Sequence, residues 1–307
     1  MVKWLAVIFM KKKIGGILGL FSATIIWGSS FIAQSVGMDY IGPFTFQAVR
    51  CFLAVLGLLP LIALFDCFRK DGKTFFSRWM DKQLWKVGFL CSIPLTLAVN
   101  LQQIGIMTTD VGKSAFLSAM YIVIVPLIGL FLGRKTSKMI WLSVFLSVVG
   151  LYCLSCVGVT RVQIGDICLI LCAVAFSVQI LLVDSRADHL DSLRLNLLQA
   201  LFCSVFSAIP MLILETPDLQ TIASCALPLS YSGFLSMGLA YSLQIVGQKY
   251  LEPAPASLIL SLESAFALLF GCLLLQETLT VWEAVGCVLV FSAVILSQIP
   301  PKQKVAL

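Results

Sequence analysis

The chain has 307 residues, of which 60% are hydrophobic and 12% are charged, and its mean hydropathy is +1.01. A soluble domain carries about 25% charged residues, so this composition excludes a water-soluble globular protein and indicates a polytopic membrane protein. The net charge of +6 does not indicate a nucleic-acid partner, because the basic residues lie in short loops between apolar runs, where they report topology.

The first 13 residues precede the first apolar run that is long enough to span a bilayer. Met1–Met10 is apolar but too short, and no small-residue cleavage site follows it, so an upstream extension or interfacial segment is expected rather than a signal peptide. Lys11–Lys13 then forms a basic cluster. We therefore assign residues 1–13 to a cytoplasmic N-terminal segment.

Ten apolar runs follow, and each is close to the length of about 20 residues that a bilayer core requires. We expect every one to be an α-helix, because lipid offers no other partners to the backbone of a single segment. Pro94 and Pro126 lie inside two of the runs and predict kinks. The predicted spans are Ile14–Val36, Pro43–Phe65, Leu84–Gly105, Thr109–Leu132, Met139–Cys156, Gly165–Val183, Leu193–Leu214, Pro228–Gln248, Pro253–Leu275 and Val281–Gln298.

The basic residues gather in every second loop, from Lys11–Lys13 at the start to Lys302 and Lys304 at the end. The alternate loops contain only Lys113 and Arg161 among basic residues. Since cytoplasmic loops carry the excess of Lys and Arg, the pattern predicts a multi-pass protein of the plasma (inner) membrane with both termini in the cytoplasm.

The sequence also contains an internal repeat. Residues 101–155 align without a gap with residues 243–297, at an offset of 247 minus 105, which is 142. The first two spans of each half align at an offset of 165 minus 16, which is 149. The coinciding pairs include Gly105 with Gly247, Gly129 with Gly271, Gly16 with Gly165, Trp27 with Phe176 and Arg50 with Gln199.

Ten spans in two copies give five spans per copy, and an odd number forces the second copy to begin on the opposite face. The predicted fold is therefore an all-α membrane protein of ten helices in two inverted five-helix repeats, with a substrate site near mid-membrane between them. The predicted boundaries are a first repeat at 14–156, an external linker at 157–164, a second repeat at 165–298 and a cytoplasmic tail at 299–307.

Several segments resemble the EamA-type branch of the drug/metabolite transporter superfamily. They are Trp27-Gly-Ser-Ser-Phe31, Arg50, Gly112-Lys-Ser-Ala-Phe-Leu117 with Tyr121 and Pro126-Leu127, Ser261-Leu-Glu-Ser-Ala-Phe266, and Gly271 through Gln276-Glu277-Thr278-Leu279. The resemblance implies two EamA domains that export or import small metabolites by alternating access. One departure concerns the loop that ends each half, where Gly133-Arg134 and Gln276-Glu277 stand in place of the family's frequent Gly-Glu.

Arg50 and Glu263 are the ionisable residues predicted to lie deepest in the membrane, where charged groups are costly. Their expected depths differ by roughly 7 Å, so we hypothesise a common cavity in which Arg50 attracts a substrate carboxylate and Glu263 titrates or pairs with it. A structural ion pair is the alternative. The predicted substrate-binding residues are Trp27, Arg50, Gln102, Tyr121, Gln244 and Glu263, with Glu263 also as the coupling residue.

The favoured function is a secondary transporter of a small organic metabolite that is amino-acid-like, amphiphilic or cationic, with proton coupling and export as the expected direction. A nucleotide-sugar or phosphorylated-metabolite exchanger is the alternative within the superfamily, although phosphate would require several cavity cations. An intramembrane enzyme is a third possibility, which a single histidine, His189, and the lack of catalytic motifs disfavour. No cofactor or metal is expected. The expected partners are the substrate and the bilayer, and the protein is a monomer or homodimer.

Overall fold

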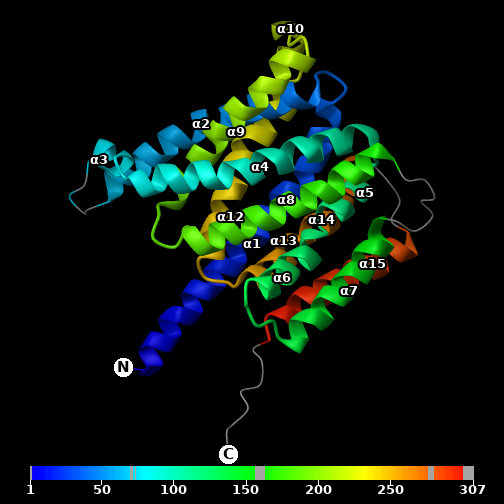
Figure 1. Ribbon diagram of the computed structural model, residues 1–307. Helices are drawn as coiled ribbons and strands as arrows, with labels where there is room; N and C mark the ends of the chain where they lie inside the picture. The colour runs from blue at the N-terminus through cyan, green and yellow to red at the C-terminus, as the bar shows by residue number, and fades with distance from the viewer. Residues whose placement is uncertain (1, 70–71, 73, 156–162, 276–279, 300–307) are drawn as a thin grey trace, which may run out of the picture.

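The computed structural model describes residues 2–69, 72, 74–155, 163–275 and 280–299, and every regular element within them is helical (Figure 1). Most of the predicted linker and tail, and also Glu277, lie outside the described residues. The elements are α1 (Val2–Gly37), α2 (Pro43–Phe68), α3 (Phe75–Trp79), α4 (Lys82–Thr108), α5 (Val111–Ser118), α6 (Tyr121–Phe131), α7 (Lys138–Ser155), α8 (Ile164–Arg186), α9 (Ser192–Leu214), α10 (Leu219–Ser224), α11 (Ala226–Ser230), the π-helical η1 (Tyr231–Ala240), α12 (Tyr241–Gln248), α13 (Pro253–Leu260), α14 (Leu262–Leu275) and α15 (Val281–Ser297).

Seven helical segments in the described part of the chain are long and apolar enough to cross a membrane. Two further apolar helices, Lys138–Leu154 and Val281–Ser297, are shorter. The remaining predicted span, Pro228–Gln248, coincides with the consecutive segments α11, η1 and α12. The first helix begins at Val2, so the N-terminal apolar residues extend α1, whose N-terminal end projects from the bundle (Figure 1). The structure is thus an all-helical, multi-span protein.

The fourth and ninth predicted spans are each interrupted at the same place in the repeat. α5 and α6 are separated at Ala119, and α13 and α14 are separated at Ser261, which is Ala119 displaced by 142 positions. At both breaks a backbone hydrogen bond between residues three positions apart tightens the turn. Ile122 N donates to Ala119 O at 3.0 Å, and Ser264 N donates to Ser261 O at 3.2 Å. The interruption therefore lies at Ala119, and α6 continues through Pro126, where a kink was predicted.

Two repeat-equivalent glycines, Gly105 and Gly247, are required by close helix contacts of the same kind in the two repeats. A Cβ atom at Gly105 would lie 2.4 Å from Leu169 Cγ, and one at Gly247 would lie 2.6 Å from Leu20 Cγ. Gly105 and Gly247 are equivalent at the offset of 142, and Leu20 and Leu169 are equivalent at the offset of 149. Small residues let membrane helices approach closely, so the same contact joins α4 to α8 and α12 to α1.

α7 and α15 occupy equivalent places in the two repeats and lie side by side at one edge of the bundle (Figure 1). A Cβ atom at Gly150 would lie 2.8 Å from Val290, and one at Gly286 would lie 2.8 Å from Leu154. Residue numbers thus fall along α15 as they rise along α7. The two helices are antiparallel.

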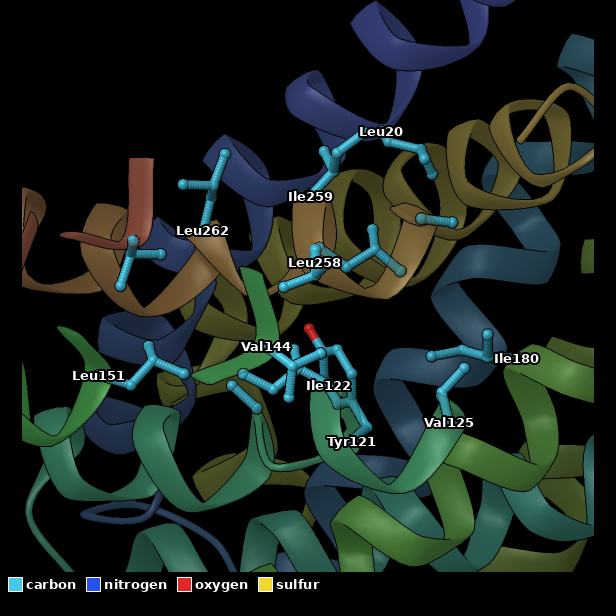
Figure 2. Packing of buried hydrophobic residues seen from close by; sticks show 14 of the residues in the cluster. Leu20, Tyr121, Ile122, Val125, Val144, Leu151, Ile180, Leu258, Ile259 and Leu262 are labelled. Carbon is cyan, nitrogen blue, oxygen red and sulfur yellow. The ribbon is translucent and has the colours of Figure 1, made fainter. Parts of the chain in front are cut away.

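A buried apolar cluster joins the two interrupted segments to α1 (Figure 2). It contains Leu20 of α1, Tyr121 and Ile122 of α6, and Leu258 and Ile259 of α13. Lipid is as apolar as these side chains, so van der Waals packing rather than water exclusion stabilises such a contact. The cluster holds the start of α6 against the α13–α14 segment and so positions the polar side chains described next.

Candidate functional site

A cavity with about 440 Å³ of empty space lies between the two repeats. The space is spread thinly between side chains, so only water-sized molecules fit in this conformation. Eight of its lining residues form four repeat-equivalent pairs. The pairs are Trp27 with Phe176, Phe31 with Ile180, Gln102 with Gln244, and Tyr121 with Glu263.

All six residues predicted from the sequence as substrate-binding line this cavity. Arg50 joins Trp27, Gln102, Tyr121, Gln244 and Glu263 there. The structure therefore brings the predicted residues together, while their contact with a substrate remains a prediction.

Tyr121 and Glu263 contact each other across the repeat interface. The hydroxyl of Tyr121 donates a hydrogen bond of 2.9 Å to Glu263 Oε1, and the two residues are 142 positions apart. Equivalent positions can touch only where the pseudo-symmetry axis passes between them, so this pair marks the axis. In Figure 2 the side chain of Tyr121 extends from α6 toward the segment that carries Leu258. Both residues lie just after the shared interruption, and Glu263 lies in the first turn of α14, where the helix dipole favours negative charge.

Trp27 and Tyr241 form an aromatic wall. Their ring centroids are 4.8 Å apart, and Trp27 Nε1 donates to the carbonyl oxygen of Ser236 at 3.3 Å. An aromatic ring with a satisfied polar edge can contact an apolar ligand face without leaving a buried donor unpaired. This wall therefore suits an apolar or aromatic portion of a substrate.

Arg50 lies on α2, and its side chain is fully buried. Its Nε and Nη1 atoms have no hydrogen-bond partner among the described residues. The Phe46 ring centroid lies 6.0 Å from its Cζ atom. Within the described part of the chain Arg50 makes no ion pair, so the hypothesised pairing with Glu263 is absent from this conformation although both side chains line one cavity.

The two predicted glutamines have different partners. Gln102 Nε2 donates to Ser118 Oγ at 3.3 Å. Gln244 Nε2 donates to Gln179 Oε1 at 3.2 Å, and Gln179 Nε2 donates in turn to Gln199 Oε1 at 3.2 Å. The second repeat therefore contributes a chain of amides to the cavity, as expected for interhelical hydrogen bonding in membranes.

Two open grooves lie at opposite ends of the interrupted segments. The Arg134 groove has about 1650 Å³ of space, and Gly129, Arg134 and Pro253 are among the residues that line it. The Asp110 groove has about 1320 Å³, and Asp110 and Gly271 are among the residues that line it. The α5–α6 segment thus runs from the Asp110 groove to the Arg134 groove, and α13–α14 runs the opposite way.

The two grooves are built from equivalent positions. Many residues that line one groove have their repeat-equivalent, 142 or 149 positions away in the sequence, in the lining of the other groove. Such pairs are Gly129 with Gly271, Val125 with Ala267, Thr108 with Tyr250, Asp110 with Glu252, Gly112 with Ala254, and Ile32 with Leu181.

A buried ionic cluster joins the C-terminal end of α2 to the N-terminal end of α9, close to α3. Arg194 Nη2 pairs with Asp66 Oδ2, and its Nη1 lies 3.2 Å from Asp191 Oδ2. Rings of α3 cover the guanidinium, with centroids 5.7 Å away for Phe75 and 5.2 Å away for Trp79. Burial alone would raise the pKa of Asp191, but hydrogen bonds from the Arg194 backbone and from Arg69, together with both positive charges, lower this pKa overall.

Glu215 joins the opposite ends of the same two helices. Its carboxylate accepts hydrogen bonds from Phe44 N at 2.9 Å, from Thr45 N at 2.7 Å and from Thr45 Oγ1 at 2.5 Å. These amides belong to the first turn of α2, whose N-cap residue, Gly42, has no side chain to supply an acceptor. Glu215 therefore caps α2 from the end of α9.

Three of these residues were not predicted from the sequence. Tyr241 lines the cavity opposite Trp27, but its repeat-equivalent is Val99, so the repeat carries no signal for it. Asp66 and Arg194 lie at span ends, where loop charge explains them equally well. The available signal was an acid at the C-terminal end of one span and a base at the N-terminal end of its repeat-equivalent span.

Comparison with known proteins places these features in context. The model of the family described as "EamA-like transporter family" matches residues 14–156 and 163–298. A protein of Archaeoglobus fulgidus described as an uncharacterized transporter is 29% identical, covering 93% of this chain and 86% of that protein. The uncharacterized transporter YoaV of Bacillus subtilis is 24% identical, covering 91% and 95%. One crystal structure aligns with a TM-score of 0.76 at 14% identity, covering 92% and 96%, and so shares the fold.

Proposed function

The chain belongs to the EamA-like transporter family, and from this premise we propose that it is a secondary transporter of a small organic metabolite. It acts by alternating access across the plasma membrane, is coupled to protons and works in the direction of export. Two similar proteins are described as transporters, which supports the class of activity. The substrate, coupling and direction are our proposal.

The observation that carries the proposal is a central cavity on the repeat axis with an equivalent groove at each end. Tyr121 and Glu263 mark the axis, and the Arg134 and Asp110 grooves lie at opposite ends of the two interrupted segments. Together with the antiparallel α7 and α15, this geometry supports ten crossings in two inverted repeats. Rocking one repeat against the other would open one groove to the cavity and close the other.

The charges at the two grooves support the proposed orientation. Lys13, Arg134 and Lys135 line the Arg134 groove together with Glu252, whereas Asp110 and Glu283 line the other groove together with Lys113. Cytoplasmic loops carry the excess of basic residues. The Arg134 groove therefore faces the cytoplasm in our proposal, and both termini lie on that side.

Glu263 is the proposed coupling residue. It is the carboxylate among the cavity-lining residues, and its side chain is buried with the Tyr121 hydroxyl as partner. A carboxyl group between two alternately opened grooves can take a proton from one side and release it to the other. Ionisable groups at such depth in transporters serve as proton relays.

The cavity favours a metabolite without phosphate groups over a nucleotide sugar. Recognition of phosphate uses several Arg or Lys side chains, and among the described residues that line the cavity Arg50 is the one cation. The enzyme alternative would need catalytic groups gathered at the cavity. His189, the single histidine, instead lines a separate surface pocket with Arg69 and Asp191.

Replacement of Glu263 by Gln tests the coupling. Purified protein in proteoliposomes is given a metabolite mixture with and without an imposed pH gradient. We expect the wild type to move at least one metabolite, and Glu263→Gln to reduce gradient-driven transport at least about tenfold, the scale of one lost charged contact. Asp39→Asn is the matched control, because Asp39 is an exposed carboxylate. Wild-type rate and pH dependence in Glu263→Gln would remove the carboxylate from the mechanism.

A further inference from the structure

We propose that the transported metabolite carries a carboxylate group and that Arg50 is the residue that binds it. This inference rests on the proposed function, because it names the chemical class of the substrate for the same cavity. It excludes a purely cationic metabolite, which the sequence alone left open.

Arg50 is a buried cation that makes no ion pair among the described residues. Its side chain is 1% exposed, and its Nε and Nη1 atoms lack a hydrogen-bond partner among the described residues. A buried charge is costly unless it is paired and hydrogen-bonded. The buried ion pairs of the described residues, such as Arg194 with Asp66 and Lys113 with Asp166, follow this rule. Arg50 departs from it, and it does so in the wall of the central cavity.

The equivalent position in the second repeat carries no charge, although it is only partly hydrogen-bonded: the Nε2 atom of the residue there, Gln199, has no partner among the described residues. Arg50 displaced by 149 positions is Gln199, whose Oε1 atom accepts a hydrogen bond from Gln179. A neutral amide at this place therefore takes part in a polar network between helices. If Arg50 served only to pack helices together, a neutral amide such as that of Gln199 would suffice at its position in the first repeat. The positive charge on one repeat alone indicates a ligand with one negative group.

The guanidinium geometry selects a carboxylate among small anions. Its planar fork of donors matches the two carboxylate oxygens in parallel hydrogen bonds. A phosphate would also fit one arginine, but it would bring a second negative charge toward Glu263 in the same cavity. Trp27 and Tyr241 line the remaining space with aromatic rings. The expected ligand is a small carboxylate with an apolar or aromatic body, with or without an amino group.

Matched compounds that differ only in charge test this inference. Purified protein in detergent is heated with 3-phenylpropionate, with its amide 3-phenylpropionamide and with the amine 3-phenylpropylamine. The same measurement is made with 4-methylpentanoate, 4-methylpentanamide and 4-methylpentylamine. Phenylalanine and leucine are each compared with phenylalaninamide and leucinamide. We expect the thermal unfolding midpoint to rise by at least about 3 °C with one or more carboxylates at saturation, and to stay within about 1 °C with the matched amides and amines.

Arg50 variants separate binding from structure. In Arg50→Gln the shift with carboxylates is expected to vanish, while the midpoint without ligand stays the same or rises, because an unpaired buried charge has been removed. Arg50→Lys keeps the charge and should retain part of the shift. Arg186→Gln is the control, since Arg186 is exposed and lies away from the cavity.

Three results would overturn the inference. In the first, amides or amines raise the unfolding midpoint as much as the carboxylates do. In the second, no carboxylate raises the midpoint. In the third, the rise in midpoint with a carboxylate persists in Arg50→Gln. Failure of the proposed function looks different. In that case the carboxylate binds the detergent-solubilised protein, but wild-type proteoliposomes do not accumulate the radiolabelled compound.

Discussion

The two ends of the α2–α9 pair are joined by equivalent residues with different chemistry. Asp66 and Glu215 are equivalent at the offset of 149, and so are Thr45 and Arg194. At one end Asp66 pairs with Arg194, and at the other Glu215 binds Thr45 and the start of α2. The same two positions of the repeat therefore meet twice, once at each end.

The chemistry at the two ends follows the charge of the two membrane faces. The Asp66 end lies among basic residues, and there the acid meets a buried guanidinium covered by Phe75 and Trp79. The Glu215 end lacks such a cation among its described contacts, and there the acid meets the partial positive charge of a helix N-terminus. A duplicated contact can thus be kept while its donors change from a guanidinium to backbone amides and a hydroxyl.

The largest expected effect comes from removing the cation at the Asp66 end. Arg194→Ala removes the closest partner of the buried Asp66, which keeps only Arg78 at 3.7 Å and Arg69 at 3.9 Å among its described ion pairs, and it removes the group that Phe75 and Trp79 cover. Breaking one side of a buried pair costs about 3–5 kcal/mol, so we expect a loss of this size in the free energy of unfolding, measured by denaturant titration in detergent micelles. The double variant Asp66→Asn/Arg194→Met should recover part of it. Equal losses in the single and double variants would contradict the role given to the pair.

A smaller effect is expected at the Glu215 end. Glu215→Ala removes an acceptor from the first turn of α2, and the loss of such a cap costs about 1–2 kcal/mol. The same unfolding measurement checks this value. Glu252→Ala, which removes an exposed carboxylate, should change stability by less than about 0.5 kcal/mol. A loss at Glu215 as large as that at Arg194 would show that the two ends are energetically alike.

Much of the fold was predictable because the bilayer restricts the choices. Apolar length marks helices, and the offset of 142 correctly paired Gly105 with Gly247, which make equivalent contacts with Leu169 and Leu20. The same alignment paired Tyr121 with Glu263, which lie in hydrogen-bond contact. Repeat-equivalent residues near the axis must be neighbours, so the repeat carries three-dimensional information.

The remaining features depend on contacts that one sequence does not encode locally. The interruption at Ala119 has no glycine or proline to mark it, and the nearby Pro126, for which a kink was predicted, lies inside the continuous helix α6. Tyr241 enters the cavity because η1 and α12 bring it against Trp27, and its repeat-equivalent, Val99, is apolar. The pairing of Asp66 with Arg194 joins residues 128 positions apart whose charges also fit loop topology.

Access to the cavity from each side tests the central claim most directly. Leu260 lines the cavity and is apolar, so Leu260→Cys in a transport-competent variant without native cysteines places one thiol there. We predict that a membrane-impermeant thiol reagent labels it from the outside in intact cells and from the inside in inverted vesicles. Cross-linking across the Arg134 groove should abolish only the labelling from the inside. Labelling from one side alone, under every condition of pH and substrate, would contradict alternating access.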